Sequence, residues 1–181
     1  MRYDERVEEI AVVDGAFEVR STRERYRSST VLLAIGRRGT PRHLGVPGED
    51  HSKVVYRLVG AEQYRGRRVL VVGGGDSALE AACSLAEEPN TTAILSYRGN
   101  AFSRAKQENR ARVDAAVASG KLTIYLDSNV LAIHPSTVEI QTERGVQTIE
   151  NDAVIVCVGG VLPTGFLRSI GVKIETKHGT A

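Results

Sequence analysis

Three consecutive glycines, Gly73 to Gly75, follow the apolar run Val69 to Val72 and precede a helix-forming stretch. Glycine tolerates a positive φ and lets the backbone approach a bound group, so we assign the turn to Gly73 and the close approach to Gly75. The small side chain of Ala78 would let the helix pack on the strand. Free amides at the positive end of such a helix bind phosphates. The run therefore predicts a dinucleotide pyrophosphate site formed by Gly73, Gly74, Gly75, Asp76, Ser77 and Ala78.

The elements around the glycines decide how much this pattern means, because a glycine turn between strand and helix also occurs in proteins that bind no nucleotide. Val69 to Val72 are β-branched or Leu residues without interruption, as expected for a parallel strand buried on both faces. Asp76 or Ser77 can cap the helix that follows, and Pro89 ends it. A second strand over residues 92–97 completes a β-α-β unit of about 30 residues, the length that dinucleotide binding requires.

The residues after the second strand indicate which nucleotide binds. NAD sites usually hold the ribose 2′-hydroxyl with an acidic residue about 20 residues beyond the glycines, and this chain has Tyr97, Arg98 and Arg104 there instead. A guanidinium can bind a 2′-phosphate through two parallel hydrogen bonds, whereas a carboxylate would repel it. We therefore predict NADP(H) as the cofactor. The alternative is that both arginines are solvated residues at the start of a helix near residues 104–119.

Other reactive side chains give less definite predictions. Asp76 and Glu80 lie four residues apart on one helix face, so Glu80 could contact the nicotinamide side of a cofactor. Alternatively, Asp76 interacts with the helix dipole and Glu80 is solvated. Cys83 and Cys157 form no C-x-x-C pair, and we interpret both as small buried hydrophobic residues. The four histidines lack metal-ligand spacing, so we predict no metal site and no catalytic acid, base or nucleophile.

Composition excludes several classes of partner. The chain has 181 residues, of which 41% are hydrophobic and 25% charged, and its net charge is only +2. A nucleic-acid-binding surface needs a larger charge excess, so we expect no nucleic acid partner. No apolar run approaches the roughly 18 residues that span a bilayer, and the charged start is not a signal peptide. We expect a cytoplasmic protein without membrane association, whose ligand is a small-molecule nucleotide.

The order of elements predicts an α/β fold, with a Rossmann-like domain of parallel sheet and β-meander. The Asp14-Gly15 pair is a strong signal for a hairpin turn near the N-terminus. The β-α-β unit covers residues 67–98. The remaining predicted elements are strands over residues 7–13, 17–21, 29–35, 122–126, 129–134, 137–142, 146–150 and 153–158, and helices near residues 104–119 and 163–170.

One pattern occurs twice: a polar residue, a buried strand, a glycine and then a proline, over Thr30 to Pro41 and over Asp152 to Pro163. With these two copies around its nucleotide unit, the chain resembles the thioredoxin-reductase-like branch of the pyridine nucleotide-disulfide oxidoreductase family. The segments that carry the resemblance are Thr30 to Gly36, Leu44 to Asp50, Gly73 to Ala78, Tyr97-Arg98 with Arg104, and Asp152 to Gly159 with Pro163-Thr164.

The resemblance implies an NADPH domain inserted into an FAD domain, linked by two strands near residues 42–66 and 159–164. In such proteins hydride passes from the nicotinamide to the flavin, so the implied cofactors are NADP(H) and, in the complete protein, FAD. Gly159 then joins the predicted cofactor-binding residues. We expect a partial FAD-domain β segment over residues 1–42, a linker over 43–66, the NAD(P)H-binding domain over 67–160 and a return segment to the FAD domain over 161–181.

Two departures from the family pattern limit the prediction. Residues 54–64 lack the C-x-x-C pair of thioredoxin reductases, which excludes dithiol exchange and favours relatives similar to ferredoxin-NADP reductases, bacillithiol-disulfide-reductase-like proteins or flavin monooxygenases. No FAD-type glycine fingerprint precedes Thr30, and the chain stops at Ala181, before the terminal Gly-Asp segment of the family. We therefore expect flanking β-rich segments of a truncated FAD domain, and a chain that is inactive alone.

Two functions follow from these observations. The first is the NADP(H)-binding part of an FAD-dependent oxidoreductase. The sequence does not identify its electron acceptor, and a homodimer is compatible with the family. The second is a non-catalytic module that binds or senses NADP(H).

Overall fold

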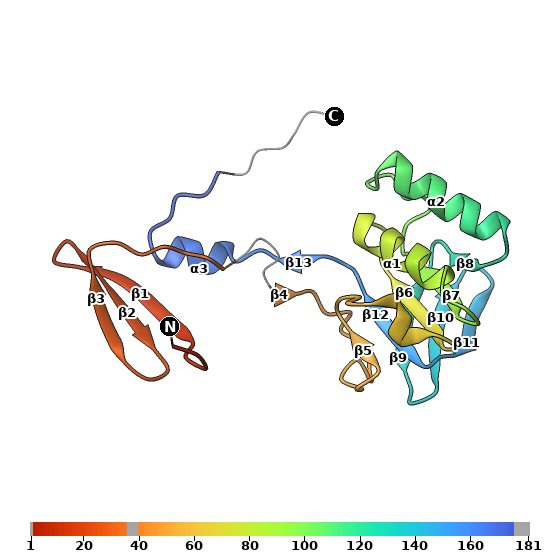
Figure 1. Ribbon diagram of the computed structural model, residues 1–181, viewed down its shortest axis with the longest axis horizontal. Helices are drawn as coiled ribbons and strands as arrows, with labels where there is room; N and C mark the ends of the chain where they lie inside the picture. Colours follow the sequence, from red (N-terminus) through yellow and green to blue (C-terminus); the bar gives the residue numbers. More distant parts are fainter. Residues whose placement is uncertain (1, 36–39, 176–181) are drawn as a thin grey trace. The chain divides into compact units, whose positions relative to one another are not determined.

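The computed structural model describes residues 2–35 and 40–175. Two compact units make up the chain: one contains Met1–Thr40 together with Gly160–Ala181, and the other contains Pro41–Gly159. Figure 1 gives the elements of both units, and each unit is described here by itself.

A five-stranded parallel sheet forms the centre of the unit Pro41–Gly159. Its strand order is β5-β12-β6-β7-β8, and all four neighbouring pairs are parallel. The predicted α/β class with a parallel sheet is thereby confirmed. The strands are β5 (Val54–Val55), β12 (Ala153–Val156), β6 (Arg68–Val72), β7 (Thr92–Ser96) and β8 (Leu122–Tyr125).

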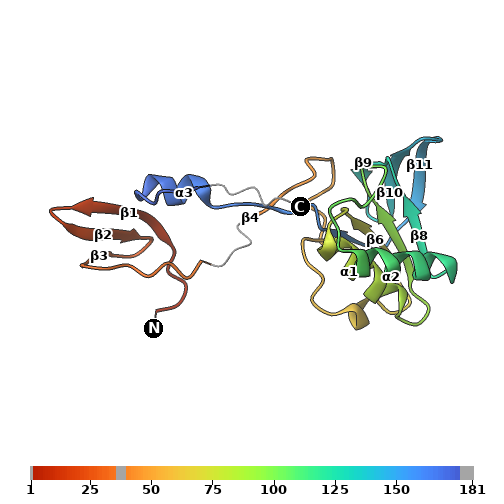
Figure 2. The same ribbon diagram turned by 90° about the horizontal axis from the view of Figure 1, so that it is seen from above.

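Helices cover one face of this sheet, as Figures 1 and 2 show. They are α1 (Asp76–Ala86) and α2 (Gln107–Ala118), and a 3-10 turn η1 (Ala61–Tyr64) contacts α1. Buried residues of both helices, such as Leu79 and Val113, share one core with Val69 and Val71 of β6. The predicted helix near residues 104–119 therefore exists, but it begins three residues later than expected.

An antiparallel meander covers the other face of the sheet. It consists of β9 (Asn129–Ile133), β10 (Thr137–Thr142) and β11 (Gly145–Glu150), close to the predicted strands. Its Val138 and Ile140 share a second core with Leu70 and Val72 of β6. Successive residues of a strand point to opposite faces, so the buried part of β6, Val69 to Val72, is apolar at every position between the two covering layers.

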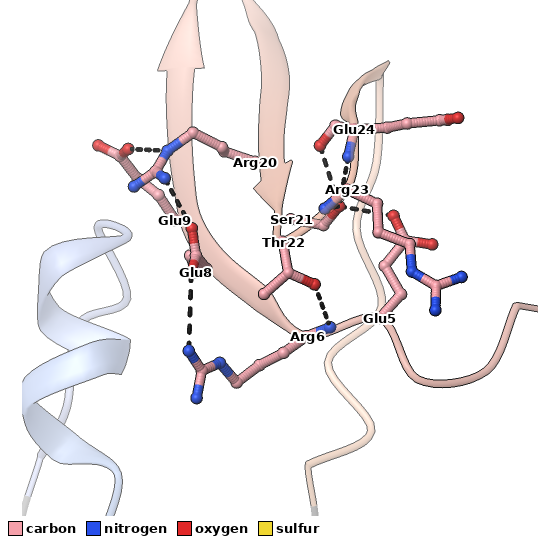
Figure 3. Close-up of polar contacts among 9 residues, drawn as sticks. All are labelled: Glu5, Arg6, Glu8, Glu9, Arg20, Ser21, Thr22, Arg23 and Glu24. Atoms are coloured by element: carbon pink, nitrogen blue, oxygen red, sulfur yellow. Dashed lines mark hydrogen bonds and ion pairs between the residues drawn. The ribbon is translucent and has the colours of Figure 1, made fainter.

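The N-terminal part of the other unit is a three-stranded antiparallel sheet. Its strands are β1 (Val7–Val13), β2 (Ala16–Ser21) and β3 (Arg25–Ser28), in that order. Asp14 and Gly15 have φ values of 49° and 75°, which confirms the predicted hairpin turn. Charged side chains pair across the strands, with Arg20 bound to Glu8 and Glu9 (Figure 3). Helix α3 (Thr164–Ser169) lies within the predicted helix near residues 163–170.

The predicted buried strand over residues 29–35 is wrong. These residues form no strand, and the side chains of Leu32 and Ile35 are 92% and 51% exposed. An apolar strand is stable only where neighbouring strands and layers cover it, and none of the described strands pairs with this segment. Gly36, the predicted end of the strand, lies outside the described residues.

Two short strands lie at the points where the chain passes from one unit to the other. They are β4 (Thr40–Pro41) and β13 (Gly160–Val161), which pair with each other. Within residues 2–35 and 40–175, no helix has the length and hydrophobicity to cross a membrane.

Candidate functional site

A cavity of about 200 Å³ lies at the carboxyl ends of β12, β6 and β7, entirely within the unit Pro41–Gly159. β6 connects through α1 to β7 on one side, while β12 is its neighbour on the other side. Ligands of doubly wound sheets bind at such a switch point, outside the carboxyl ends of the strands. The cavity is lined by Arg42, His43, Leu44, Val46, Val72, Gly73, Gly74, Ser96, Tyr97, Arg98, Arg104, Ser128, Asn129, Val130 and Val158.

Gly73 makes the sharp turn out of β6. Its φ is 147°, a conformation that residues with side chains rarely adopt. A Cβ at this position would overlap the carbonyl oxygen of Cys157 and would lie 3.0 Å from the Cβ of the fully buried Ala78. The missing side chain thus allows the turn to contact both β12's continuation and α1, as the sequence predicts for Gly73 and Ala78.

The next two glycines differ in their surroundings. A Cβ on Gly74 would overlap the ring of Tyr97, so Gly74 provides room for that aromatic side chain. A Cβ on Gly75 would meet no atom within 4 Å, so the backbone of Gly75 faces open space. A bound group can therefore approach this backbone directly.

The predicted side-chain cap of α1 is wrong for both candidates, Asp76 and Ser77. Gly75 is the N-cap residue, and no side chain caps the helix. Asp76 Oδ1 instead accepts hydrogen bonds from the Lys106 amide at 2.8 Å and from Asn109 Nδ2 at 2.7 Å. These bonds, with the Lys106 amide the largest contributor, lower the pKa of Asp76. Of the first-turn amides, that of Ala78 donates to the Gly75 carbonyl oxygen at 2.9 Å, which leaves the amides of Asp76 and Ser77 as those that can bind an anion.

Glu80 lies outside the cavity lining, and its alternative contact with the nicotinamide stays a prediction. It is exposed, does not line the cavity, and accepts a hydrogen bond from Asn109 Nδ2 at 3.0 Å. Asp76 accepts from the same amide group. The two carboxylates therefore join α1 to α2 through Asn109, which is a structural role.

Arg98 and Arg104 both line the cavity and are exposed. α2 begins only at Gln107, so neither arginine lies in the helix, but both are exposed, and the alternative that they are solvated residues without a ligand stays open. The ring of Tyr97 stacks on Phe102 with a centroid separation of 5.5 Å. Neither arginine takes part in an ion pair within the described residues, and none of the described residues that line the cavity is acidic. The loop after β7 therefore presents two free cations to the cavity.

Five of the predicted cofactor residues do not line the cavity: Gly75, Asp76, Ser77, Ala78 and Gly159. Gly159 has a φ of 90°, and its carbonyl oxygen accepts a hydrogen bond from the Arg42 amide at 3.1 Å. The cofactor contacts of all ten predicted residues stay predictions.

Sequence reasoning missed the wall of the cavity that Arg42 and His43 form. These residues stand directly before Leu44 to Asp50, a segment that carries the family resemblance but was assigned to the linker. Because Arg42 and His43 directly precede this segment, their position in the sequence could have indicated that they belong to the site. Ser128, Asn129 and Val130 had no such signal, because only the fold brings the start of β9 to the cavity.

Hydrogen bonds hold the segment after His43 in place. Glu49 accepts the amides of Leu44 and Gly45, each at 2.7 Å, and the Tyr56 hydroxyl at 3.0 Å. Burial opposes the ionisation of Glu49, but these three donors outweigh it and hold its pKa below the ordinary value. The Tyr56 hydroxyl also lies 2.7 Å from His43 Nδ1.

The two cysteines are free, and the prediction that both are buried is confirmed for Cys83 only. Cys83 is buried and Cys157 is half-buried. Burial raises the pKa of the Cys157 thiol to about 11, so the thiol is neutral near pH 7. A neutral thiol is a poor nucleophile, and Cys157 does not line the cavity.

Comparison with known proteins gives the family. The sequence profile described as pyridine nucleotide-disulphide oxidoreductase matches residues 1–180. Bacilliredoxin reductase Bdr from Bacillus subtilis (strain 168) is 30% identical over 168 residues, which are 92% of this chain and 52% of that protein. A ferredoxin–NADP reductase from Ignicoccus hospitalis is 30% identical over 159 residues, 84% of this chain and 50% of that protein.

A solved structure gives the same result. The bacillithiol disulfide reductase Bdr (YpdA) from Staphylococcus aureus has a TM-score of 0.82 and 28% identity, and the match covers 96% of this chain and 54% of that one. The chain therefore spans about half the length of these relatives.

Proposed function

Since the chain belongs to the pyridine nucleotide-disulphide oxidoreductase family, we propose that it forms the NADP(H)-binding part of a flavin-dependent reductase. The observation that carries the proposal is the pair Arg98 and Arg104, two exposed guanidinium groups at the cavity beside the glycine turn. No acidic residue lines the described cavity, so a ribose 2′-phosphate would meet attraction only.

The geometry of the turn fits a dinucleotide. Gly73 and Gly74 permit close packing of the strand, the helix and Tyr97, while the backbone of Gly75 is open on the side where a Cβ would stand. The uncapped first turn of α1 offers its amides to a pyrophosphate. NADPH, when bound, supplies a hydride, and the residues of this chain bind and orient it.

The names of the relatives support the direction of the chemistry. One is a ferredoxin–NADP reductase and two are reductases of bacilliredoxin or bacillithiol disulfide. FAD enters the proposal through the family resemblance, and we assign flavin contacts to no residue of this chain. The electron acceptor remains outside the proposal.

Calorimetric titration of the chain with NADPH and NADH tests the nucleotide assignment. We expect NADPH to bind more tightly, and Arg98→Ala or Arg104→Ala to weaken NADPH roughly 10- to 100-fold, since a charge-assisted hydrogen bond contributes about 1.5–3 kcal/mol. NADH binding should change little. Arg110→Ala is the matched control, because Arg110 is exposed on α2 and does not line the cavity. Equal losses for both nucleotides would contradict the 2′-phosphate assignment.

One observation favours a second candidate, a module that binds or senses NADP(H) without catalysis: the cavity lies wholly within Pro41–Gly159. Absorbance spectra separate the two candidates. A yellow protein that bleaches on addition of NADPH supports the reductase, whereas a colourless protein that still binds NADPH supports the module. A chain that fails to bind NADPH contradicts both.

A further inference from the structure

We propose that Arg42 binds the nicotinamide-nucleotide half of NADPH, on the opposite side of the glycine turn from Arg98 and Arg104. This assignment rests on the proposed function, because it concerns the same ligand. Arg98 and Arg104 form one cationic wall of the cavity, and Arg42 forms a second cationic wall that contacts another part of that ligand. It gives a binding role to a residue that the glycine and arginine motifs do not include.

The strand order separates the two cationic walls. Arg98 and Arg104 follow β7, whereas the Arg42 amide donates to the carbonyl oxygen of Gly159, three residues after β12 ends. β6 and its glycine turn lie between β12 and β7. Neighbouring strands are about 4.8 Å apart, so the two walls are anchored roughly 10 Å apart along the edge of the sheet.

The chemistry of dinucleotide sites assigns a different part of the ligand to each wall. The residues after the second strand of the β-α-β unit meet the adenosine ribose, and the pyrophosphate lies at the N-terminus of the helix after the first strand. The nicotinamide nucleotide must then continue past the glycine turn toward β12. Arg42 lines the cavity on that side. Its guanidinium can bind the phosphate of this half through two parallel hydrogen bonds.

The wall that contains Arg42 is fixed before a ligand arrives. The neighbouring His43 ring contacts Tyr56 edge to face, with a centroid distance of 4.9 Å and the Nδ1–hydroxyl hydrogen bond. Tyr56 in turn donates to Glu49, whose side chain is only 10% exposed. The Ile133 amide donates to Pro47 O at 2.9 Å and joins the same segment to β9. The backbone that carries Arg42 then loses little conformational freedom on binding, which favours affinity.

The charge of Arg42 is available to a ligand. Within the described residues, Arg42 belongs to no ion pair, and its recorded hydrogen bond uses the backbone amide. Glu49 is the carboxylate of the neighbouring segment, but the amides of Leu44 and Gly45 and the Tyr56 hydroxyl already occupy it. A bound phosphate would therefore be an uncontested partner for the guanidinium.

Titration of the whole chain with four probes tests the assignment: NADPH, NADH, nicotinamide mononucleotide and adenosine 2′,5′-bisphosphate. We expect Arg42→Ala to weaken NADPH and NADH by the same factor, roughly tenfold, and to weaken the mononucleotide as well. Its affinity for the bisphosphate should equal that of the unchanged chain. Arg98→Ala should weaken NADPH and the bisphosphate and should change the affinities for NADH and the mononucleotide little. Arg42→Lys, which keeps the charge, should recover part of the affinity, and Arg110→Ala should change none.

Two results would overturn the assignment. One is NADPH binding by Arg42→Ala at the affinity of the unchanged chain. The other is an equal loss of NADPH and of the bisphosphate, since a general disturbance of the cavity would weaken both. If the unchanged chain binds none of the four probes, the proposed function itself fails. Thermal unfolding of Arg42→Ala and Arg42→Lys is the control, and we expect both variants to unfold cooperatively near the midpoint of the unchanged chain.

Discussion

Gly73 and Gly75 have opposite surroundings, although only Gly74 separates them. At Gly73 both the φ of 147° and the carbonyl oxygen of Cys157 exclude a side chain. At Gly75 the φ is −101° and the space is open, so the folded protein itself tolerates a Cβ there. The first glycine therefore serves the fold, whereas the second leaves its backbone accessible to a ligand.

A pair of alanine variants separates these two roles. Gly73→Ala should lower the free energy of unfolding by about 1–3 kcal/mol, the usual cost of a strained backbone position. Gly75→Ala should change it by less than about 0.5 kcal/mol and yet weaken NADPH roughly tenfold or more, because the new methyl group stands where the pyrophosphate approaches. Urea denaturation and calorimetry measure the two quantities. Normal NADPH binding by a folded Gly75→Ala would contradict the pyrophosphate assignment.

At the scale of elements, Arg68 and Asp152 join the starts of the adjacent strands β6 and β12. The guanidinium donates to both carboxylate oxygens, at 2.6 and 2.9 Å, and the Arg68 amide donates at 2.8 Å. The side-chain hydrogen bond from Arg68 is the main cause that holds the pKa of Asp152 well below its ordinary value of about 3.9. Both side chains are about one-third exposed, so solvent weakens the pair.

This pair predicts how stability depends on pH. Because the folded state lowers the pKa of Asp152, its contribution is fully present above about pH 4 and is lost as the pH falls toward the folded-state pKa. We expect urea denaturation to show a smaller loss of stability between pH 6 and pH 2.5 for Asp152→Asn than for the unchanged chain. Asp114→Asn, an exposed change on α2, should leave the pH profile unchanged. Glu49 and Asp76 act in the same direction, so the profile of Asp152→Asn should stay sloped.

Sequence patterns predicted the elements whose signals are local. The β-α-β unit, the hairpin at Asp14-Gly15 and the meander all depend on short runs of residues and their turns. The failures depend on distant partners: Asp76 does not cap α1 because the Lys106 amide and Asn109 occupy its carboxylate. Similarly, Arg42 reaches the cavity only because β12 lies next to β6 in the sheet, an order that sequence spacing does not contain.

At the scale of the whole molecule, the nucleotide cavity and the hydrophobic cores belong to one unit. The lining residues run from Arg42 to Val158, and of the buried hydrophobic side chains in the described residues only Ile10 lies outside Pro41–Gly159. Burial of apolar surface is the main source of folding free energy. The unit Pro41–Gly159 therefore holds nearly all of the described apolar core together with every residue that lines the cavity.

A shortened chain of residues 40–161 tests this division. It retains β4, β13 and every lining residue of the cavity. We expect it to unfold cooperatively and to bind NADPH with a Kd within about twofold of the full chain, since no ligand contact is removed. Circular dichroism and calorimetry provide the measurements. A folded shortened chain with much weaker NADPH binding would mean that residues outside this unit contribute to the site.

The hydrogen bond between Arg42 and Gly159 brings the two ends of this unit together. Segments with adjacent ends can replace a surface loop of an unrelated protein without stretching it, and they tolerate circular permutation. Residues 40–161 therefore suit insertion into a surface loop of another protein, and a fluorescent reporter that carries them would show whether NADPH changes the conformation of this segment.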